Sequence, residues 1–300
     1  MEQKNAITIT IIGVGLIGGS LALDLRYKYS VKRIIGVDKS PEHLIRAKQL
    51  GLIDESASLQ DAIDRSDLLI LSTPVSTSCK LLPKILDKLT NQVIIDVGST
   101  KANILRLVKE HPQRGRYVAT HPMAGTEFSG PDAAIVNLYQ NKNVILCDVE
   151  TSDNDALGLV KDIYKSIGMN ILYMESSAHD IHAAYVSHIS HISSFALSLT
   201  VLDKEKEKKN ILDMASGGFE STVRLAKSAA SMWMPIFMLN NENVLDVMDN
   251  YIGKLQQFRD AISNKDESKI IGLIEESNKI KKVLDKEDEP ALIESDFLNE

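Results

Sequence analysis

A glycine-rich turn near the N-terminus constrains the fold of this chain more than any other feature. The spacing Gly13-x-Gly15-x-x-Gly18 follows an apolar run over residues 6–12 and precedes a helix-like segment over residues 20–29. In such a strand, turn and helix, the first glycine allows the tight turn, the second lets backbone approach a pyrophosphate, and the third lets helix and strand pack closely. The free N–H groups at the helix start favour an anion. The segment therefore predicts a dinucleotide-binding fold.

Two later segments complete the predicted cofactor site. Asp38 ends the next apolar strand, twenty residues after Gly18, where a carboxylate can accept hydrogen bonds from the adenosine ribose. It would repel a 2′-phosphate, which favours NAD over NADP, although the neighbouring Lys39 weakens that preference. A Ser-Thr-Pro segment follows a further strand and is expected beside the nicotinamide. The predicted cofactor-binding residues are Gly13, Gly15, Leu16, Ile17, Gly18, Asp38, Ser72, Thr73 and Pro74.

Strand and helix patterns alternate through the first half of the chain. Strands rich in Ile, Val and Leu are expected at residues 33–37, 67–72, 92–96, 117–120 and 143–147. They predict an α/β fold, with a Rossmann-type, mostly parallel sheet and helices on both faces. Helical periodicities replace the strands after Ser177, with helices expected at 222–239, 242–264 and 267–284. We therefore expect an NAD-binding domain over residues 1–176 and an all-α domain over residues 177–300.

Composition excludes several functional classes. The chain has 300 residues, a net charge of −7 and a pI of about 5.6, which argues against general binding to nucleic acid. Cys79 and Cys147 are far apart, so neither a disulfide framework nor a thiolate zinc site is indicated. No apolar stretch approaches the roughly 20 residues of a membrane span, and no signal peptide is evident. The sequence predicts a cytoplasmic protein that binds neither nucleic acid nor membranes.

The loop from His121 to Gly130 holds the densest reactive chemistry. Its histidine can accept a proton from a substrate hydroxyl, which assists hydride abstraction from a carbinol carbon; the alternative is a histidine that caps backbone groups. Ser99, in a loop at the same sheet edge, could bond that hydroxyl or fix the imidazole tautomer. Lys101 could attract an anionic substrate or be an exposed lysine at a helix start. Glu127 could orient polar contacts or accept bonds from loop N–H groups.

The helical half adds further polar candidates. Asp180 and His191 are eleven residues apart, which predicts one face of a regular helix three turns long. His188 and His191 could in principle chelate a metal, but no third ligand of matching spacing is evident, so no metal site is predicted. Arg224 follows a glycine pair and suits bidentate recognition of a carboxylate; an ion pair between helices is the alternative.

Several motifs together resemble the prephenate dehydrogenase family of tyrosine biosynthesis, from the first strand to about Val244. The motifs are Gly13-Val-Gly-Leu-Ile-Gly-Gly-Ser20, Asp96-Val-Gly-Ser-Thr-Lys101, His121-Pro-Met-Ala-Gly-Thr-Glu127, Val186-Ser-His-Ile-Ser-His191 and the stretch from Gly217-Gly-Phe219 to Trp233. The resemblance implies a dinucleotide-binding domain followed by a helical domain through which two chains form a homodimer. It also implies roles for individual residues. His121 would be the catalytic histidine, with Ser99 as its hydrogen-bonding companion and Lys101 in the preceding loop. Arg224 would bind the substrate carboxylate, His191 and Gly217 would lie near the substrate side chain, and Glu127 and Trp233 would lie near the pocket entrance.

The activity implied by the resemblance is oxidative decarboxylation of prephenate to 4-hydroxyphenylpyruvate and CO₂ with reduction of NAD⁺. Ser221 and Thr100 depart from residues frequent in the family, an aspartate and a valine. Neither a regulatory ACT domain nor a chorismate mutase segment is expected in this chain. Arogenate is the alternative substrate. A β-hydroxyacid dehydrogenase would need a catalytic lysine in the helical half, where none is evident, and a nonenzymatic NAD-binding sensor would bind cofactor without turnover.

Overall fold

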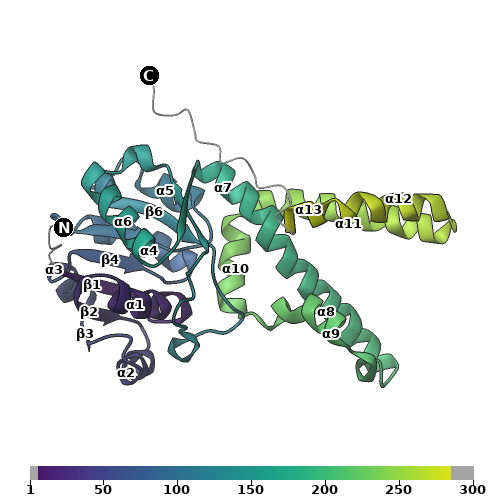
Figure 1. Ribbon diagram of the computed structural model, residues 1–300, viewed down its shortest axis with the longest axis horizontal. Helices are drawn as coiled ribbons and strands as arrows, with labels where there is room; N and C mark the ends of the chain where they lie inside the picture. Colours follow the sequence, from purple (N-terminus) through teal and green to yellow (C-terminus); the bar gives the residue numbers. More distant parts are fainter. Residues whose placement is uncertain (1–5, 285–300) are drawn as a thin grey trace. The chain divides into compact units, whose positions relative to one another are not determined.

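The computed structural model describes residues 6–284, which fall into two compact units divided between Val244 and Leu245. The first unit contains an eight-stranded sheet and the helices up to residue 244 (Figure 1). The second is helical. Within residues 6–284, no helix is both long and apolar enough to cross a bilayer. The end of the predicted helical domain, residues 285–300, lies outside the described residues.

The sheet confirms the predicted Rossmann-type fold. Its strand order is β3-β2-β1-β4-β5-β6-β7-β8, and neighbouring strands are parallel except for β6 and β7, which are antiparallel. From β3 to β6 this is the strand order of dinucleotide-binding sheets. The strands are β1 (Ile7–Ile12), β2 (Val31–Val37), β3 (Glu55–Ser56), β4 (Leu68–Leu71), β5 (Val93–Asp96), β6 (Tyr117–Pro122), β7 (Asn143–Cys147) and β8 (Asn170–Met174).

Helices cover both faces of the sheet because alternate strand residues point to opposite sides. In β4, Leu68 and Ile70 pack in the core that includes residues of α1 and α6. Leu69 and Leu71 pack in the core that includes residues of α3, α4 and α5. The helices of this layered part are α1 (Leu16–Lys28), α2 (Pro41–Gln49), α3 (Leu59–Asp64), α4 (Val75–Leu86), α5 (Ala102–Val108) and α6 (Asn154–Ser166).

Three strand details differ from the sequence predictions. The short β3 and the strand β8 were not predicted. His121 lies within β6 rather than in a loop, because antiparallel pairing with β7 extends that strand to Pro122, with His121 opposite Ile145. The predicted loop therefore begins only at Met123, and the histidine side chain projects from a regular strand.

The helices that follow the sheet also correct the predictions. One continuous helix follows β8 (Figure 1). It consists of α7 (Ser176–Ala183), a π-helical turn (Ala184–His188) and α8 (Ile189–Glu207). The prediction that Asp180 and His191 lie three regular turns apart is therefore wrong, since a π turn holds an extra residue. The predicted helix over 222–239 is also wrong. It is divided into α9 (Gly217–Val223), a 3₁₀ turn (Arg224–Lys227) and α10 (Ala230–Leu239), because Ser228 and Ala229 adopt extended backbone angles.

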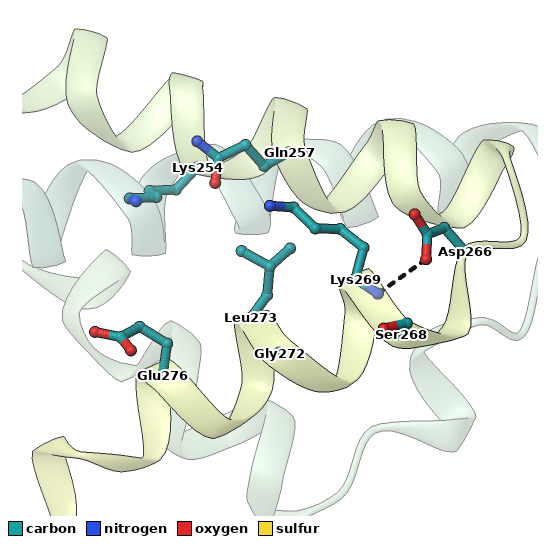
Figure 2. A pocket seen from close by; sticks show the side chains of 8 residues that line it. All are labelled: Lys254, Gln257, Asp266, Ser268, Lys269, Gly272, Leu273 and Glu276. Atoms are coloured by element: carbon teal, nitrogen blue, oxygen red, sulfur yellow. Dashed lines mark hydrogen bonds between the residues drawn. The ribbon is translucent and has the colours of Figure 1, made fainter.

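The second unit holds α12 (Glu267–Asn278), α13 (Ile280–Leu284) and the part of α11 (Asn241–Ser263) that follows Val244. The predicted helix over 267–284 is thus interrupted at Lys279. Figure 2 shows the groove between α11 and α12, with Lys254 on one side and Lys269 and Glu276 on the other. Asp266 caps α12 by accepting a 2.9 Å hydrogen bond from the Lys269 N–H group. All predicted site residues precede this unit in the sequence.

Candidate active site

The glycine turn has the geometry that a pyrophosphate needs. Gly13 has a φ of +97°, and a Cβ there would lie 2.6 Å from the Ser72 carbonyl oxygen. Gly15 caps α1, and no side chain binds the cap in the described part of the chain. A Cβ on Gly15 would meet only the Gly130 nitrogen, at 3.9 Å. The first N–H groups of α1 thus remain available to an anion.

Asp38 lies directly beside this turn, at the end of β2. Its carboxylate accepts backbone hydrogen bonds from Val14 at 3.1 Å and Ser40 at 2.9 Å. Each oxygen keeps a lone pair that can accept a bond from a ribose hydroxyl. The glycine turn, the free helix start and this carboxylate together fit NAD.

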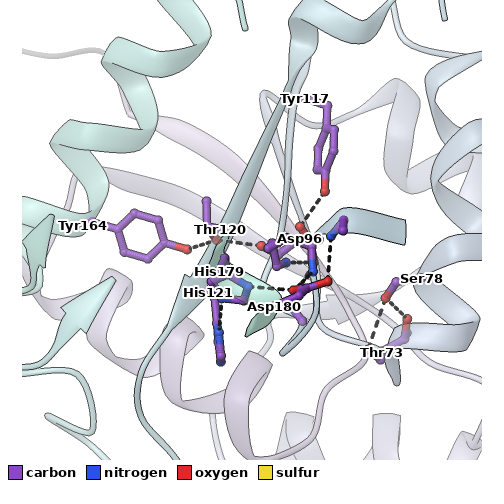
Figure 3. A network of polar contacts seen from close by, with 12 residues as sticks. Thr73, Ser78, Asp96, Tyr117, Thr120, His121, Tyr164, His179 and Asp180 are labelled. Carbon is purple, nitrogen blue, oxygen red and sulfur yellow. Dashed lines mark hydrogen bonds and ion pairs between the residues drawn. The ribbon is translucent and has the colours of Figure 1, made fainter. Parts of the chain in front are cut away.

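The predicted segment Ser72, Thr73 and Pro74 joins β4 to α4. The Ser72 hydroxyl donates to the Gly13 carbonyl oxygen at 2.7 Å, so it braces the glycine turn. The Thr73 hydroxyl bonds to that of Ser78 at 2.8 Å (Figure 3). Pro74 is the N-cap of α4. These contacts hold the segment at the carboxyl edge of the sheet, where the nicotinamide is expected.

His121 is 9% exposed and belongs to a chain of hydrogen bonds that the sequence did not predict (Figure 3). Its Nδ1 atom lies 2.8 Å from Nε2 of His179, whose Nδ1 atom lies 2.8 Å from Oδ1 of Asp180. Asp180 also accepts backbone N–H bonds from Lys101 at 2.7 Å and Ala102 at 2.9 Å. These hydrogen bonds thus connect β6 through α7 to the start of α5.

Burial lowers the pKa of His121 well below its ordinary value of 6.5. Electrostatic interactions with His179, Lys101 and His188 lower this pKa further. A buried imidazole in such surroundings is neutral at neutral pH. It can therefore accept a proton from a bound hydroxyl group.

Lys101 lies against Asp96 rather than in an open pocket. Its side chain is fully buried, and its Nζ atom forms an ion pair with Oδ2 of Asp96. The other oxygen of Asp96 accepts the Tyr117 hydroxyl at 2.6 Å, and burial followed by the charge of Asp96 raises the pKa of Tyr117 well above its ordinary value. Ser99 lies two residues before Lys101, and the Nδ1 atom of His121 bonds to His179 rather than to Ser99. Direct contacts of Ser99 and Lys101 with a substrate stay predictions.

A second cluster brings together His191 and Trp233. Their rings stack with centroids 3.6 Å apart, and His188 meets Trp233 edge-on at 5.9 Å. The Asn240 amide nitrogen donates to the Asp180 carbonyl oxygen at 2.7 Å and lies 3.3 Å from Nδ1 of His188. Asn240 therefore connects this aromatic cluster with the chain of bonds at His121. The sequence suggested His188 only as half of a metal-binding pair, with no role in the reaction. No local sequence pattern predicted a role for Asn240.

Glu127 and Arg224 form a third group. The Arg224 guanidinium lies 3.0 Å from Oε2 of Glu127, and its side chain is 50% exposed. Arg224 stands on the 3₁₀ turn after α9, whereas Gly217 begins α9 at an exposed position. A half-exposed ion pair contributes little to stability. The guanidinium can therefore exchange Glu127 for another carboxylate without a large penalty.

The buried His188 should make the protein sensitive to acid. Burial lowers the pKa of His188 from 6.5 to about 4. The unfolded chain takes up this proton below pH 6.5 while the folded one does not, so the free energy of unfolding falls as the pH falls from 6.5 to 4. The expected contribution is about 3 kcal/mol. Urea unfolding across this range should show a shallower decline for His188→Gln, and an unchanged decline would contradict the assignment.

No cluster of three His, Cys, Asp or Glu side chains suited to a metal ion occurs among residues 6–284. The structure thus adds no third ligand to His188 and His191.

Comparisons with known proteins agree with this architecture. The family model described as "Prephenate dehydrogenase, nucleotide-binding domain" matches residues 21–173, and that of "Prephenate dehydrogenase, dimerization domain" matches residues 175–276. The models thus meet near residue 174, whereas contacts divide the chain after Val244. The boundary at 176/177 stays a prediction.

Individual relatives match over most of their length. The prephenate dehydrogenase of Bacillus subtilis is 32% identical over 263 residues, 86% of this chain and 71% of the relative. The cyclohexadienyl dehydrogenase of Zymomonas mobilis is 31% identical over 279 residues, 92% of this chain and 95% of the relative. A crystal structure of prephenate dehydrogenase from A. aeolicus with hydroxyphenyl propionate and NAD⁺ superposes with a TM-score of 0.85 and 32% identity, covering 95% of this chain and 99% of that one. With its glycine turn, buried histidine and both matched domains, the chain belongs to the prephenate dehydrogenase family.

Proposed function

We propose that this protein catalyses the NAD⁺-dependent oxidative decarboxylation of prephenate to 4-hydroxyphenylpyruvate and CO₂. The observation that carries the proposal is the position of the buried His121. It lies near the carboxyl end of β6, and the glycine turn follows the carboxyl end of β1, while burial keeps the pKa of the imidazole low. A base at this edge suits the removal of a hydroxyl proton beside a nicotinamide. The relatives named prephenate dehydrogenase support the choice of substrate.

The chemistry assigns one proton to His121. When bound, NAD⁺ would supply the acceptor for the hydride that leaves the ring carbon bearing the hydroxyl group. His121 takes the proton of that hydroxyl, so a carbonyl forms as the C–H bond breaks. The bond between the ring and its carboxylate then breaks, CO₂ leaves, and the electron pair makes the ring aromatic. The phenolic oxygen recovers the proton from His121, which ends the cycle neutral.

The other predicted residues serve binding in this proposal. Arg224 holds a substrate carboxylate, and Ser99 bonds the ring hydroxyl. Lys101 supports the loop that carries Ser99 through its ion pair with Asp96. The remaining substrate-side residues are His191, Gly217, Glu127 and Trp233. The match to a dimerization domain supports a homodimer through the helical part, and we expect a cytoplasmic enzyme that binds neither nucleic acid nor membranes.

Arg224→Ala should raise the KM for prephenate roughly 10- to 100-fold with a smaller change in kcat, because a charged hydrogen bond contributes about 1.5–3 kcal/mol. Steady-state kinetics measures both constants. Arg33→Ala is a matched control, since Arg33 is also 50% exposed and pairs with a glutamate, Glu55, at 2.9 Å. An unchanged KM for Arg224→Ala would show that the arginine only pairs with Glu127.

The function is tested by following NADH or NADPH absorbance in four mixtures, prephenate or arogenate with NAD⁺ or NADP⁺. The strongest signal is expected with prephenate and NAD⁺. Faster turnover of arogenate would favour the second candidate, which the cyclohexadienyl dehydrogenase relative keeps open because both compounds contain a cyclohexadiene ring. Cofactor binding without turnover in all four mixtures would instead indicate a sensor and overturn the proposal.

A further inference from the structure

We propose that His179 and Asp180 are positioning residues that hold His121 in the tautomer whose Nε2 atom is free to accept a proton. The inference rests on the proposed function, in which His121 is the base. It assigns a role to two buried side chains that the reaction itself does not require to touch substrate, since His179 is 1% and Asp180 2% exposed.

The direction of the hydrogen bonds begins at Asp180. A carboxylate can only accept, and this one already accepts the backbone N–H groups of Lys101 and Ala102. Its bond to His179 Nδ1, 2.8 Å long, therefore requires the proton to be on that nitrogen. The two backbone N–H groups thus fix the orientation of the carboxylate independently of the protonation of either histidine.

The same logic passes through His179 to His121. A neutral imidazole carries one N–H, so His179 protonated at Nδ1 has an unprotonated Nε2 that can only accept. Its 2.8 Å contact with His121 then requires the proton of His121 to be on Nδ1. The lone pair of His121 consequently lies on Nε2, the ring nitrogen that this chain of bonds leaves free.

The surroundings of the two rings favour this arrangement. The rings meet edge-on, with centroids 5.0 Å apart and planes at 68°. The charged or titratable groups that influence His121 are His179 on α7, Lys101 before α5 and His188 in the π turn, and the ammonium of Lys101 is compensated by Asp96. When His121 takes the substrate proton, its cation remains bonded through His179 to the carboxylate of Asp180. A carboxylate that orients and stabilises an imidazole is the logic of catalytic triads.

Nitrogen NMR of the full-length protein with ¹⁵N-labelled histidine tests the tautomers directly. The expected result is that both His121 and His179 carry their proton on Nδ1 at neutral pH. A proton on Nε2 of His121, or protons on both nitrogens of His179, would overturn the proposal. This measurement needs no turnover, so its outcome is independent of whether prephenate is the substrate.

A pair of substitutions tests the consequence for catalysis. His179→Gln places a carboxamide oxygen near the position of Nε2 and can still accept from His121, whereas His179→Met cannot. His179→Met should lower kcat about 100-fold with KM and NAD⁺ affinity near wild type, and His179→Gln should recover most of kcat. His182→Met, an exposed histidine on the same helix, is the control.

Each outcome bears on the proposal. Wild-type kcat in His179→Met, or equal losses in the Gln and Met variants, would overturn the positioning role. Thermal unfolding and NAD⁺ titration show whether each variant folds, and if the Met variant does not, the tautomer of His121 in His179→Gln decides, with Nδ1–H expected. An inactive wild-type enzyme would refute the proposed function alone and leave the tautomer measurement standing.

Discussion

His121→Asn should lower the turnover of prephenate roughly 10²- to 10⁴-fold, the usual contribution of a general base. Asparagine has an amide nitrogen near the position of Nδ1 and can still donate to His179, but it has no group that takes a proton. The polar contact in the core is therefore kept while the proton acceptor is lost. NAD⁺ affinity should change little, because within residues 6–284 the His121 side chain bonds to His179 and not to the glycine turn or Asp38.

Steady-state kinetics and NAD⁺ titration measure the two effects separately. His111→Asn is a suitable control, since His111 pairs with Asp87 at 3.1 Å outside the site. The wild-type pH profile provides a second check. Because the pKa of His121 lies well below 6.5, its protonation should reduce kcat/KM only at pH values below 6.5. Turnover of the His121→Asn variant near the wild-type value would exclude His121 as the base.

Alanine substitution at two glycines of the same turn should affect different properties, NAD⁺ binding at Gly15 and stability at Gly18. Gly15→Ala should fold normally, because the nearest atom to its Cβ is 3.9 Å away, yet weaken NAD⁺ binding roughly 10- to 150-fold by blocking bonds to the pyrophosphate. Gly18→Ala should destabilise the fold by about 3 kcal/mol or more. Its Cβ would lie 2.3 Å from the Gly13 carbonyl oxygen and 2.7 Å from Ile11 Cγ2.

Urea unfolding without cofactor and NAD⁺ titration distinguish the two variants. Gly158→Ala is the control, because Gly158 is in α6 and a Cβ there has no neighbour within 4 Å in the described residues. That substitution should stabilise the helix slightly. A Gly15→Ala protein with wild-type NAD⁺ affinity would place the pyrophosphate elsewhere.

Local spacing made the positions of the glycine turn and of Asp38 predictable, whereas their contacts with a cofactor stay predictions. The three glycines act within six residues, and Asp38 ends the very next strand, so each prediction needed only the order of strand, turn and helix. The glycine turn, the free start of α1 and the adjacent carboxylate all lie as that order implies. The mostly parallel sheet followed from the same alternation of patterns.

The hydrogen-bond partners of His121 could not be predicted in this way. His179 lies 58 residues from His121 in the sequence, and nothing local shows which ring nitrogen faces which partner. Burial of Lys101 depends on Asp96 being turned inward, which only the packed sheet determines. The break after Val223 was missed because Ser228 and Ala229 are compatible with a helix and are extended only in the folded chain.

The π turn makes the helix unusually tolerant of one change in chain length. A π turn uses one residue more than an α turn to complete about the same full rotation. Deleting one residue from Ala184–His188 would therefore restore a regular α-helical turn and leave the face of the following helix nearly unchanged. His191 would still lie on the side of Trp233, and the displacement would be confined to the turn itself, which includes His188. Relatives that lack one of these five residues are therefore expected to keep the helix faces on both sides of the turn and to differ in the position of the residue at 188.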